Sequence, residues 1–133
     1  MDKNQESAYE VVCKFWSLMA SNDFNSVRAV VADDLIVEWP QSNECIRGVS
    51  NFVRVNTEYP TAGTWHFSLI RIVASNNEVV TDVEITDGHQ QARAISFFIV
   101  KDGTIVHIRE YWPEPYQPPP NRAHLGESLE CGK

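Results

Sequence analysis

Residues 91–113 read QARAISFFIVKDGTIVHIREYWP, which is two β-rich runs joined by a tight turn. Asp102-Gly103 is a strong signal for a two-residue hairpin, because both residues tolerate the positive φ angles that such a turn requires. The sequence therefore predicts strands over 91–101 and 104–112 that pair antiparallel. Pro113 ends the second run, since proline lacks the amide that a central strand donates.

Two more strand patterns precede this hairpin. Residues 64–74 and 78–86 are rich in β-branched and apolar side chains, with turn signals at 75–77 and 87–89. Because each connection is short, the four strands are expected to be successive antiparallel neighbours. The second half of the chain is thus predicted to form one antiparallel sheet.

The first part of the chain has helical periodicity instead. Ser7 and Glu10 have the spacing of a capping box, which predicts a helix over 8–20. Asp23 is positioned to cap a second helix. The apolar side of that second helix would consist of Phe24, Val27, Val30 and Val31. Both helices would have an apolar face that needs a partner surface.

A short strand and a third helix are expected next. Residues 35–39, LIVEW, predict the strand, and residues 41–47 predict a loop. The third helix is expected to begin near Gly48 or Ser50 and to end before Pro60, because the residue before proline avoids the helical region. The face that packs on the core would be Ile46, Val49, Phe52 and Val53.

Three helices followed by neighbouring antiparallel strands predict an α+β fold. The sheet must curve around the helices to cover their apolar faces, which leaves a conical interior space of the kind that often binds ligands. The chain of 133 residues is expected to form one domain over 1–116. Residues 117–133 are expected to be a tail, since Pro118, Pro119 and Pro120 favour an extended polyproline-like chain.

Composition and charge limit the partners. The net charge is -7 without a compensating cluster of Lys and Arg, which opposes binding to nucleic acid. No apolar run approaches the roughly 18 residues of a membrane helix, and the N-terminal residues lack the apolar segment of a secretory signal. Cys13, Cys45 and Cys131 suit reduced thiols, because they are odd in number and widely spaced. We therefore expect a cytoplasmic protein without a nucleic-acid or membrane partner.

The run AISFFIV, residues 94–100, is apolar at nearly every position. A strand with one face in water should alternate between apolar and polar side chains, so this strand is expected to be covered on both faces. The helices cover one face, and a second copy of the chain could cover the other. The sequence therefore predicts a homodimer through the outer face of the sheet.

Glu110 is an acidic residue near the end of an otherwise apolar strand. Strand periodicity separates two sets: Val106, Ile108, Glu110 and Trp112 on one face, and Ile105, His107, Arg109 and Tyr111 on the other. The first set is the more apolar and is expected to face the interior, where burial would raise the pKa of the Glu110 carboxyl. Such an acid could move a proton near neutral pH. The alternative is a structural ion pair with Arg109, Arg93 or Arg71.

Other side chains are candidates for binding a ligand in the interior space. The rings of Phe15, Trp16, Trp39 and Trp112 could stack on a flat apolar ligand, although core packing is the default for most rings. Ser96 could supply a hydrogen bond. His66 could titrate near neutral pH or act as a hydrogen-bonded structural residue. Asp82 could reach the interior or pair with Arg93 on a solvated face.

No metal or cofactor is expected. The four histidines, His66, His89, His107 and His124, have no spacing that converges on a metal, and no Cys pair assists them. The sequence also has no Gly-rich phosphate loop, nucleophile elbow or nucleotide-binding motif.

Three short motifs stand in an order that resembles a known superfamily. VEWP at 37–40 ends the short strand, IRG at 46–48 precedes the third helix, and GTIVHIREYW at 103–112 forms the last strand. Over about residues 7–116 the chain resembles the nuclear transport factor 2-like superfamily, and within it the SnoaL-like polyketide cyclases and isomerases. The resemblance implies a cone-shaped α+β barrel, an interior pocket and a frequent tendency to dimerise.

Two groups within this superfamily suggest residue roles. Residues 109–113, REYWP, are similar to the end of the last strand in phenazine-biosynthesis A/B proteins, which implies that Glu110 acts as an acid or base. The assisting histidine of those proteins falls near Val55 and Asn56. Compared with ketosteroid isomerases, Trp39 stands where the general-base Asp would be and Ser96 near the protonated Asp. Their helix-1 Tyr has only Phe15 and Trp16 nearby, so the chain lacks the catalytic groups of those isomerases.

Taken together, these features predict a small-molecule enzyme without a cofactor. The expected reaction is an isomerisation, cyclisation or dehydration by proton transfer on an apolar ring-bearing substrate, with Glu110 as acid or base. Two alternatives remain open. One is a non-catalytic protein that binds or carries a small ligand in the same pocket, and the other is an interaction module that uses the dimer and its proline-rich tail.

Overall fold

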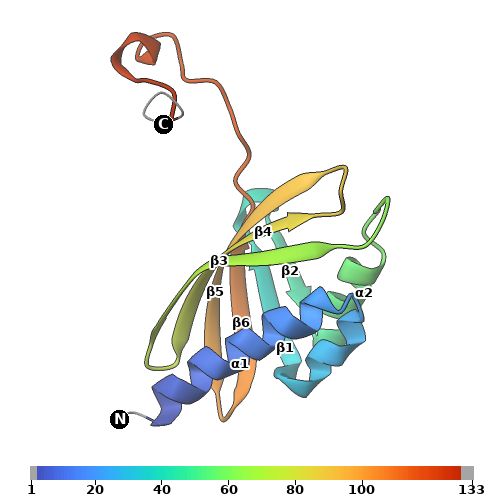
Figure 1. Ribbon diagram of the computed structural model, residues 1–133. Coiled ribbons are helices and arrows are strands. Elements are labelled where there is room, and N and C mark those ends of the chain that lie inside the picture. Colours follow the sequence, from blue (N-terminus) through green and yellow to red (C-terminus); the bar gives the residue numbers. More distant parts are fainter. Residues whose placement is uncertain (1–2, 130–133) are drawn as a thin grey trace.

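The computed structural model describes residues 3–129, with side chains from residue 8 onward (Figure 1). Two α-helices precede most of the sheet: α1 (Lys3–Ala20) and α2 (Val49–Thr57). The strands are β1 (Val31–Trp39), β2 (Glu44–Arg47), β3 (His66–Ser75), β4 (Glu78–Thr86), β5 (Gln91–Lys101) and β6 (Thr104–Tyr111). Short 3-10 helices are η1 (Phe24–Ala29), η2 (Pro40–Ser42) and η3 (Ala123–Leu125).

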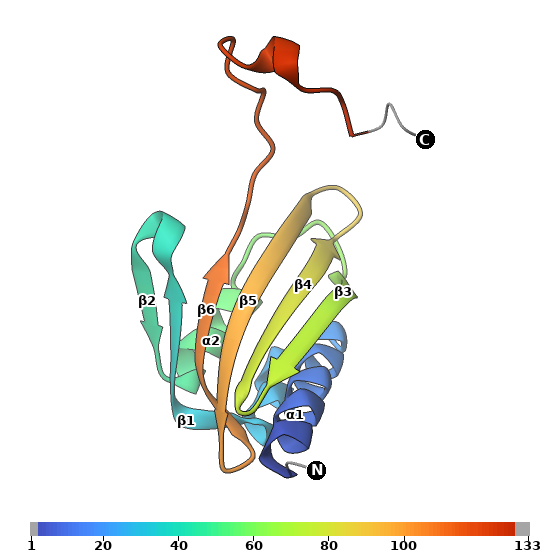
Figure 2. The same cartoon turned by 90° about the vertical axis from the view of Figure 1, so that its left-hand side faces the viewer.

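The strands form one six-stranded sheet in the order β2-β1-β6-β5-β4-β3. All neighbours are antiparallel except β1 and β6, which are parallel, so the sheet is mixed. Helices α1 and α2 lie against its concave face (Figures 1 and 2). The arrangement is an α+β cone. The expected cone-shaped barrel of an antiparallel sheet around three helices is found in part: the sheet is mixed, and it is not closed, since β2 and β3 are its edges.

The three hairpins of the second half agree with the sequence. Strands β4 and β5 have the predicted bounds, and β6 ends one residue before the predicted end. Asp102 and Gly103 have φ angles of 52° and 80°, as a two-residue turn of this kind requires. The prediction of four antiparallel neighbours is confirmed.

The first half of the chain differs from the prediction in several places. Helix α1 begins at Lys3, so Ser7 lies within the helix and is not its N-cap. The second helix is only a 3-10 helix, and Asp23 makes no side-chain capping bond to it. Val31 begins β1 instead, because pairing with β6 draws this segment into the sheet, where the Ile105 amide donates to the Val30 carbonyl at 2.8 Å.

The predicted loop at 41–47 is also ordered structure. Its last four residues form β2, which pairs with β1, so Ile46 belongs to a strand and not to the third helix. Gly48 then connects β2 to α2 with a φ of 86°, a left-handed conformation that favours glycine. Helix α2 ends at Thr57, ahead of Pro60 as expected.

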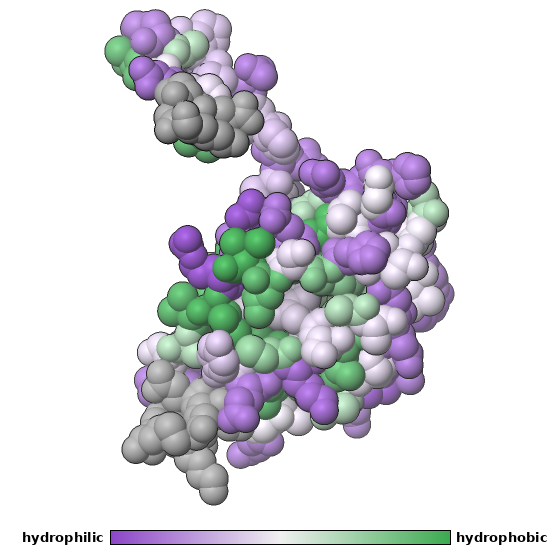
Figure 3. Space-filling view, viewed as in Figure 1, coloured by the Kyte–Doolittle hydropathy of each residue, from purple (hydrophilic) through white to green (hydrophobic). Residues whose placement is uncertain are grey.

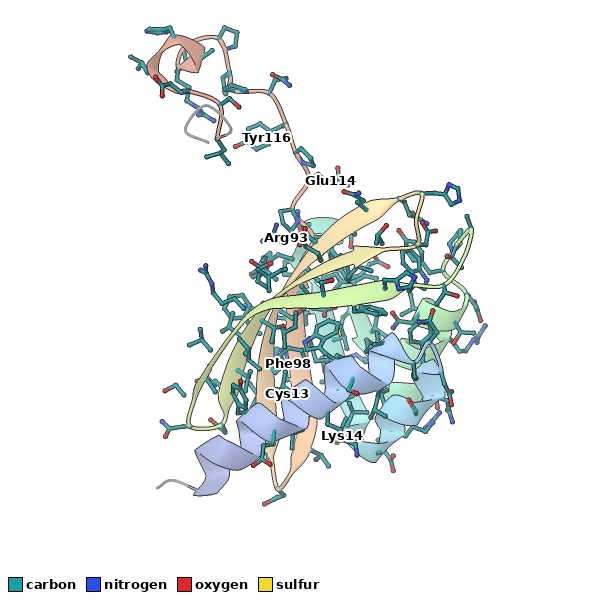
Figure 4. All side chains as sticks on the ribbon, in the orientation of Figure 1. Cys13, Lys14, Arg93, Phe98, Glu114 and Tyr116 are labelled. Carbon is teal, nitrogen blue, oxygen red and sulfur yellow. The ribbon has the colours of Figure 1, made fainter. Side chains whose placement is uncertain are left out.

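The core lies between the helices and the inner face of the sheet. In β5 the inward side chains are Ala94, Ser96, Phe98 and Val100, and all four are buried. Phe98 lies between β5 and α1, where its ring centroid is 5.4 Å from that of Phe15 (Figure 4). One sequence prediction fails here. Ile105, not Val106, is buried, because a β-bulge between β5 and β6 shifts the register by one residue.

The outer face of the sheet carries apolar side chains without a covering layer in a single chain. Register places Val73, Val80 and Phe97 side by side on neighbouring strands, with Ile95 and Ile99 above and below. Phe97 is 44% exposed and Val73 is 59% exposed. Beyond Tyr111 the chain becomes extended and leaves the body (Figures 1 and 2). Cys131 lies outside the described residues.

Candidate functional site

A cavity of about 430 Å³ lies between the two α-helices and the inner face of the sheet. Nine of its lining residues are aromatic: Phe15, Trp16, Phe24, Trp39, Phe52, Tyr59, Trp65, Phe67 and Trp112. This volume is within the range of pockets that bind small molecules. Flat apolar ligands suit such walls, because rings attract one another in stacked or edge-to-face arrangements.

Among the strand residues that line the cavity, Glu110 is the carboxylate. Strand β6 places it opposite Ser96 of β5, and its side chain is 4% exposed. The Trp39 indole Nε1 donates to Glu110 Oε1 at 3.0 Å, and the Ser96 hydroxyl donates to Oε2 at 2.8 Å. The predicted inward orientation of Glu110 is therefore what the structure has.

Burial raises the pKa of the Glu110 carboxyl, and the hydrogen bonds from Trp39 and Ser96 only partly oppose this effect. None of the ion pairs within residues 8–129 includes Glu110. Arg109 instead pairs with Glu38, and Arg93 pairs with Asp82. The structural alternative for Glu110, an ion pair with a neighbouring arginine, is thus excluded for these two partners.

The two partners of Glu110 are chemically different. An indole N–H can only donate, so Oε1 must remain an acceptor in either protonation state. A hydroxyl can donate or accept, so Ser96 can donate to the carboxylate or accept from the neutral acid at Oε2. The site can therefore hold Glu110 in both protonation states without leaving a buried polar atom unpaired.

Two tryptophans fix the wall beside Glu110. The rings of Trp39 and Trp112 meet edge to face, with centroids 5.9 Å apart and planes at 87°. The Trp112 amide also donates to the side chain of Gln41, which ties the end of β6 to η2. Glu110 is therefore flanked by apolar surface, and this surface keeps water away from its carboxyl group.

The structure brings together most of the predicted ligand-binding residues. Phe15, Trp16, Trp39 and Trp112 line the cavity, and Ser96 lies behind Glu110 as its hydrogen-bond donor. The Trp16 indole is oriented by a hydrogen bond of 3.1 Å to Thr81 Oγ1.

His66 and Asp82 do not reach the cavity. His66 is exposed at the start of β3, because the neighbouring Phe67 takes the inward position. In β4 both neighbours of Asp82, Thr81 and Val83, are buried, so Asp82 points outward, where it accepts from Arg93 Nε at 2.6 Å. The solvated pair with Arg93, which the sequence allowed, is the arrangement found.

The sequence does not predict that a group of polar residues gathers at the cavity mouth. They are Asn56, Tyr59, Gln90, Gln91 and Glu114, from α2, the loop after it, the start of β5 and the segment after β6. Asn56 had been noted only as a neighbour of Val55. No periodic pattern joins these positions, since they meet only when loops from distant segments fold together.

Asp87 holds part of this mouth in place. Its buried carboxylate accepts from the Thr61 hydroxyl and from the backbone amides of Ala62, His89 and Gln90, all at 2.9–3.0 Å. The Gln90 side chain donates both to Asp87 and to the Pro60 carbonyl. Bonds from Gln90 and Ala62 keep the pKa of the Asp87 carboxyl well below its ordinary value. The loop before β3 is therefore fastened to the β4–β5 turn.

Within residues 3–129, no three His, Cys, Asp or Glu side chains cluster as ligands for a metal ion. No helix in that part of the chain has the length and apolar character to cross a bilayer.

Helices packed in the mouth of a curved six-stranded sheet, around an aromatic cavity, define a nuclear transport factor 2-like protein. Residues 12–108 match the SnoaL-like domain family, and the chain belongs to that family. No curated protein matches the sequence.

Several solved structures are similar to this chain. One is a candidate ketosteroid isomerase from Kribbella flavida, with 30% identity, a TM-score of 0.85 and coverage of 95% of this chain and 92% of that chain. Another is an NTF2-like protein of unknown function from Burkholderia xenovorans, with 26% identity, a TM-score of 0.76 and coverage of 95% and 98%. An epoxide hydrolase from M. tuberculosis, with 24% identity, a TM-score of 0.67 and coverage of 82% and 84%, shares the fold.

Proposed function

We propose that the chain is a cofactor-free enzyme in which Glu110 transfers a proton on an apolar, ring-bearing substrate. The observation that carries this proposal is a buried carboxyl group, without a cationic partner, that lines an aromatic cavity. The similarity to a candidate ketosteroid isomerase and membership of the SnoaL-like family support the same class of chemistry.

The raised pKa of Glu110 suits it to accept a proton from carbon. The carboxylate would remove a proton from the carbon next to a substrate carbonyl, which leaves an enolate. Glu110 would then hold that proton and return it to another carbon, as in an isomerisation, or to a leaving hydroxyl, as in a dehydration. Asn56 at the mouth could donate its second amide hydrogen to the substrate oxygen on which the negative charge develops, since only the first is bonded to the Phe52 carbonyl.

A non-catalytic ligand-binding role is the second candidate. Both oxygens of Glu110 already have a protein donor, so the carboxylate could serve as a fixed polar anchor for a carried ligand. In that case the cavity would bind ring compounds but would not exchange their protons.

Proton exchange on model ketones separates the two candidates. Cyclic and steroidal ketones in D2O, followed by proton NMR, should lose the signal of hydrogens next to the carbonyl faster with the protein than without it. Glu110→Gln should reduce this exchange by about 100-fold or more, since a positioned general base contributes that much. Glu114→Gln, a carboxylate at the mouth of the same cavity, is the matched control.

The outcome distinguishes an enzyme from a carrier. Exchange that persists in folded Glu110→Gln protein would contradict the catalytic role of Glu110. Quenching of tryptophan fluorescence by the ketones, without any exchange in the wild-type protein, would favour the carrier.

We also propose that the chain forms a homodimer through the outer face of the sheet. The row Val73, Val80 and Phe97 gives this face an apolar centre, and the charged pairs Asp82–Arg93 and Glu38–Arg109 border it. An apolar centre with a polar rim is typical of protein interfaces. Sedimentation equilibrium at micromolar concentration should show a dimer, and Phe97→Lys should shift it toward monomer. A monomeric wild-type chain would contradict this proposal.

A further inference from the structure

The segment after the cavity mouth is an arm that stands apart from the body. Residues 117–129, here called the arm, continue from Tyr116 and rise beyond the end of β6 in both views (Figures 1 and 2). Pro118, Pro119 and Pro120 stiffen its first part, because proline fixes φ and has no amide to donate. Residues 118–120 therefore cannot pair as a central strand of the sheet.

The far end of the arm is mostly polar but has two large apolar side chains that nothing covers. It contains the single turn η3, held by local bonds such as those from the Arg122 and Ala123 amides to the Pro119 carbonyl. Leu125 and Leu129 are 77% and 99% exposed. One isolated helical turn is marginal in water, so packing on another surface would stabilise it.

The arm leaves on the side where the outer face of the sheet is exposed. In Figure 1 it leans to the left, and Figure 2 shows that this side presents the outer face of β3, β4 and β5. Hydrophobic residues gather on the same side of the body, below the arm (Figure 3). Val73 and Phe97 are exposed apolar residues of that face. Apolar side chains on the arm and on the face thus lie on one side of each chain.

From these observations we infer that the arm crosses to a second copy of the chain and packs Leu125 and Leu129 on the margin of that copy's outer sheet face, beside the central apolar row that the proposed dimer buries. This inference rests on the proposed homodimer. If two copies meet through their outer faces about a twofold axis, each arm extends over its partner, and no other component is required.

The length of the arm suits this role. Fully extended, residues 117–129 would reach about 40 Å. A domain of this size has a radius of gyration of about 13 Å, so the arm can cross much of a partner's surface. At its base, Pro113, Glu114 and Pro115 line the cavity mouth, so the start of the arm has a fixed position on the body.

Similar solved structures also have a segment that follows the sheet. The structures from Kribbella flavida and Burkholderia xenovorans each match 95% of this chain. Residues 1–116 are less than nine-tenths of the chain, so both matches extend into the arm. A comparable segment therefore follows the sheet in both proteins, although in this chain it stands away from its own body.

Dimer affinity tests the inference directly. Sedimentation equilibrium would compare the full chain with a chain that ends at Tyr116 and with the double variant Leu125→Ser, Leu129→Ser. Asn121→Ser, an exposed polar substitution in the same arm, is the matched control. The truncated chain should have a dimer dissociation constant at least tenfold higher, the double variant should change in the same direction, and the control should stay within twofold.

The results separate this inference from the proposed dimer. A full-length monomer would contradict both. A dimer whose affinity is unchanged by truncation and by the double variant would overturn the crossing of the arm and leave the sheet-face dimer intact. At protein concentrations below the dimer dissociation constant, the full and truncated chains should have the same thermal midpoint. This result would show that the arm does not act by stabilising its own domain.

Discussion

Glu38 and Glu110 lie on neighbouring strands but on opposite faces of the sheet. Glu38 of β1 pairs in register with Arg109, the residue immediately before Glu110. On the outer face, hydrogen bonds from His107 and then Arg109 lower the pKa of Glu38. On the inner face, burial without a cation raises the pKa of Glu110. The two carboxyl groups are thus offset by one residue in register and face opposite sides of the sheet. The one on the solvated side is an ion-pair partner, and the one on the buried side is a candidate proton carrier.

The largest expected difference between the faces is in stability. Phe98→Ala should lower the free energy of unfolding by about 3–5 kcal/mol, because Phe98 is buried against Phe15 and Trp16 and the change leaves a cavity. Phe97→Ala, one residue away on the exposed face, should change it by less than about 1 kcal/mol in the monomer. Urea denaturation at one low protein concentration measures both. Equal losses would mean that the two faces are not packed as described.

Removing a partner of the buried carboxyl group should have the next largest effect. Ser96→Ala deletes the donor to Glu110 Oε2 and should lower the free energy of unfolding by about 1–3 kcal/mol, since a buried acceptor loses its bond. It should also raise the pKa of Glu110 further, because this hydrogen bond lowers it. Ser68→Ala, at an exposed position of β3, is the control and should have little effect in denaturant unfolding. A Ser96→Ala protein as stable as this control would contradict a structural role for the bond.

The pH dependence of stability should also separate the faces. The folded protein holds the Glu110 proton more tightly than the unfolded chain, so this group stabilises the fold below its ordinary pKa of 4.5. That contribution should be lost as the pH rises from 4.5 through the higher folded pKa. Asp87 has the opposite sign, since its lowered pKa stabilises the fold above 3.8 and that contribution is lost on acidification.

Denaturant unfolding as a function of pH tests these two signs. Glu110→Gln should remove the decline in stability above pH 4.5 and keep the loss in acid. If the decline above pH 4.5 is unchanged in this variant, then Glu110 does not have a raised pKa in the folded protein.

The smallest effect is expected at Glu38. Glu38→Gln removes a partner of His107 and Arg109, but these side chains are partly solvated, and exposed ion pairs contribute little. The variant should have a thermal midpoint and a ketone-exchange rate close to those of the wild type. A large loss of exchange would show that the outer pair influences the cavity, and would weaken the contrast between the faces.

The sequence predicted the parts of the fold that depend on local chemistry. Asp102-Gly103 and the other turns fix the hairpins within a few residues, so β4, β5 and β6 were found with nearly correct bounds. The parallel pairing of β1 with β6 could not be read from local pattern, because it joins segments about 70 residues apart. The same nonlocal pairing converts Val31 from an expected helix into a strand, whereas residues 44–47 form a strand by pairing with the nearby β1.

The residues of the candidate site also fall into those that local pattern predicts and those that depend on nonlocal structure. Glu110 and Trp112 follow from strand period, and their inward positions were predicted. Val106 was misplaced because a single bulge reverses the alternation, and His66 because Phe67 fills the inward position beside it. Mouth residues such as Gln90 depend on how Asp87 gathers two distant loops, which no periodic signal records.

The protonation behaviour of Glu110 in the folded protein is the most direct test of the account. Carbon-13 NMR of the glutamate side-chain carboxyl groups, with Glu110→Gln to assign the signal, would give its pKa. A pKa clearly above the ordinary 4.5 is expected for Glu110, and a pKa below 4.5 is expected for Glu38. A Glu110 signal that titrates at or below 4.5 would contradict it, because the carboxyl group would then be an ordinary ionised side chain and not a sheltered proton carrier.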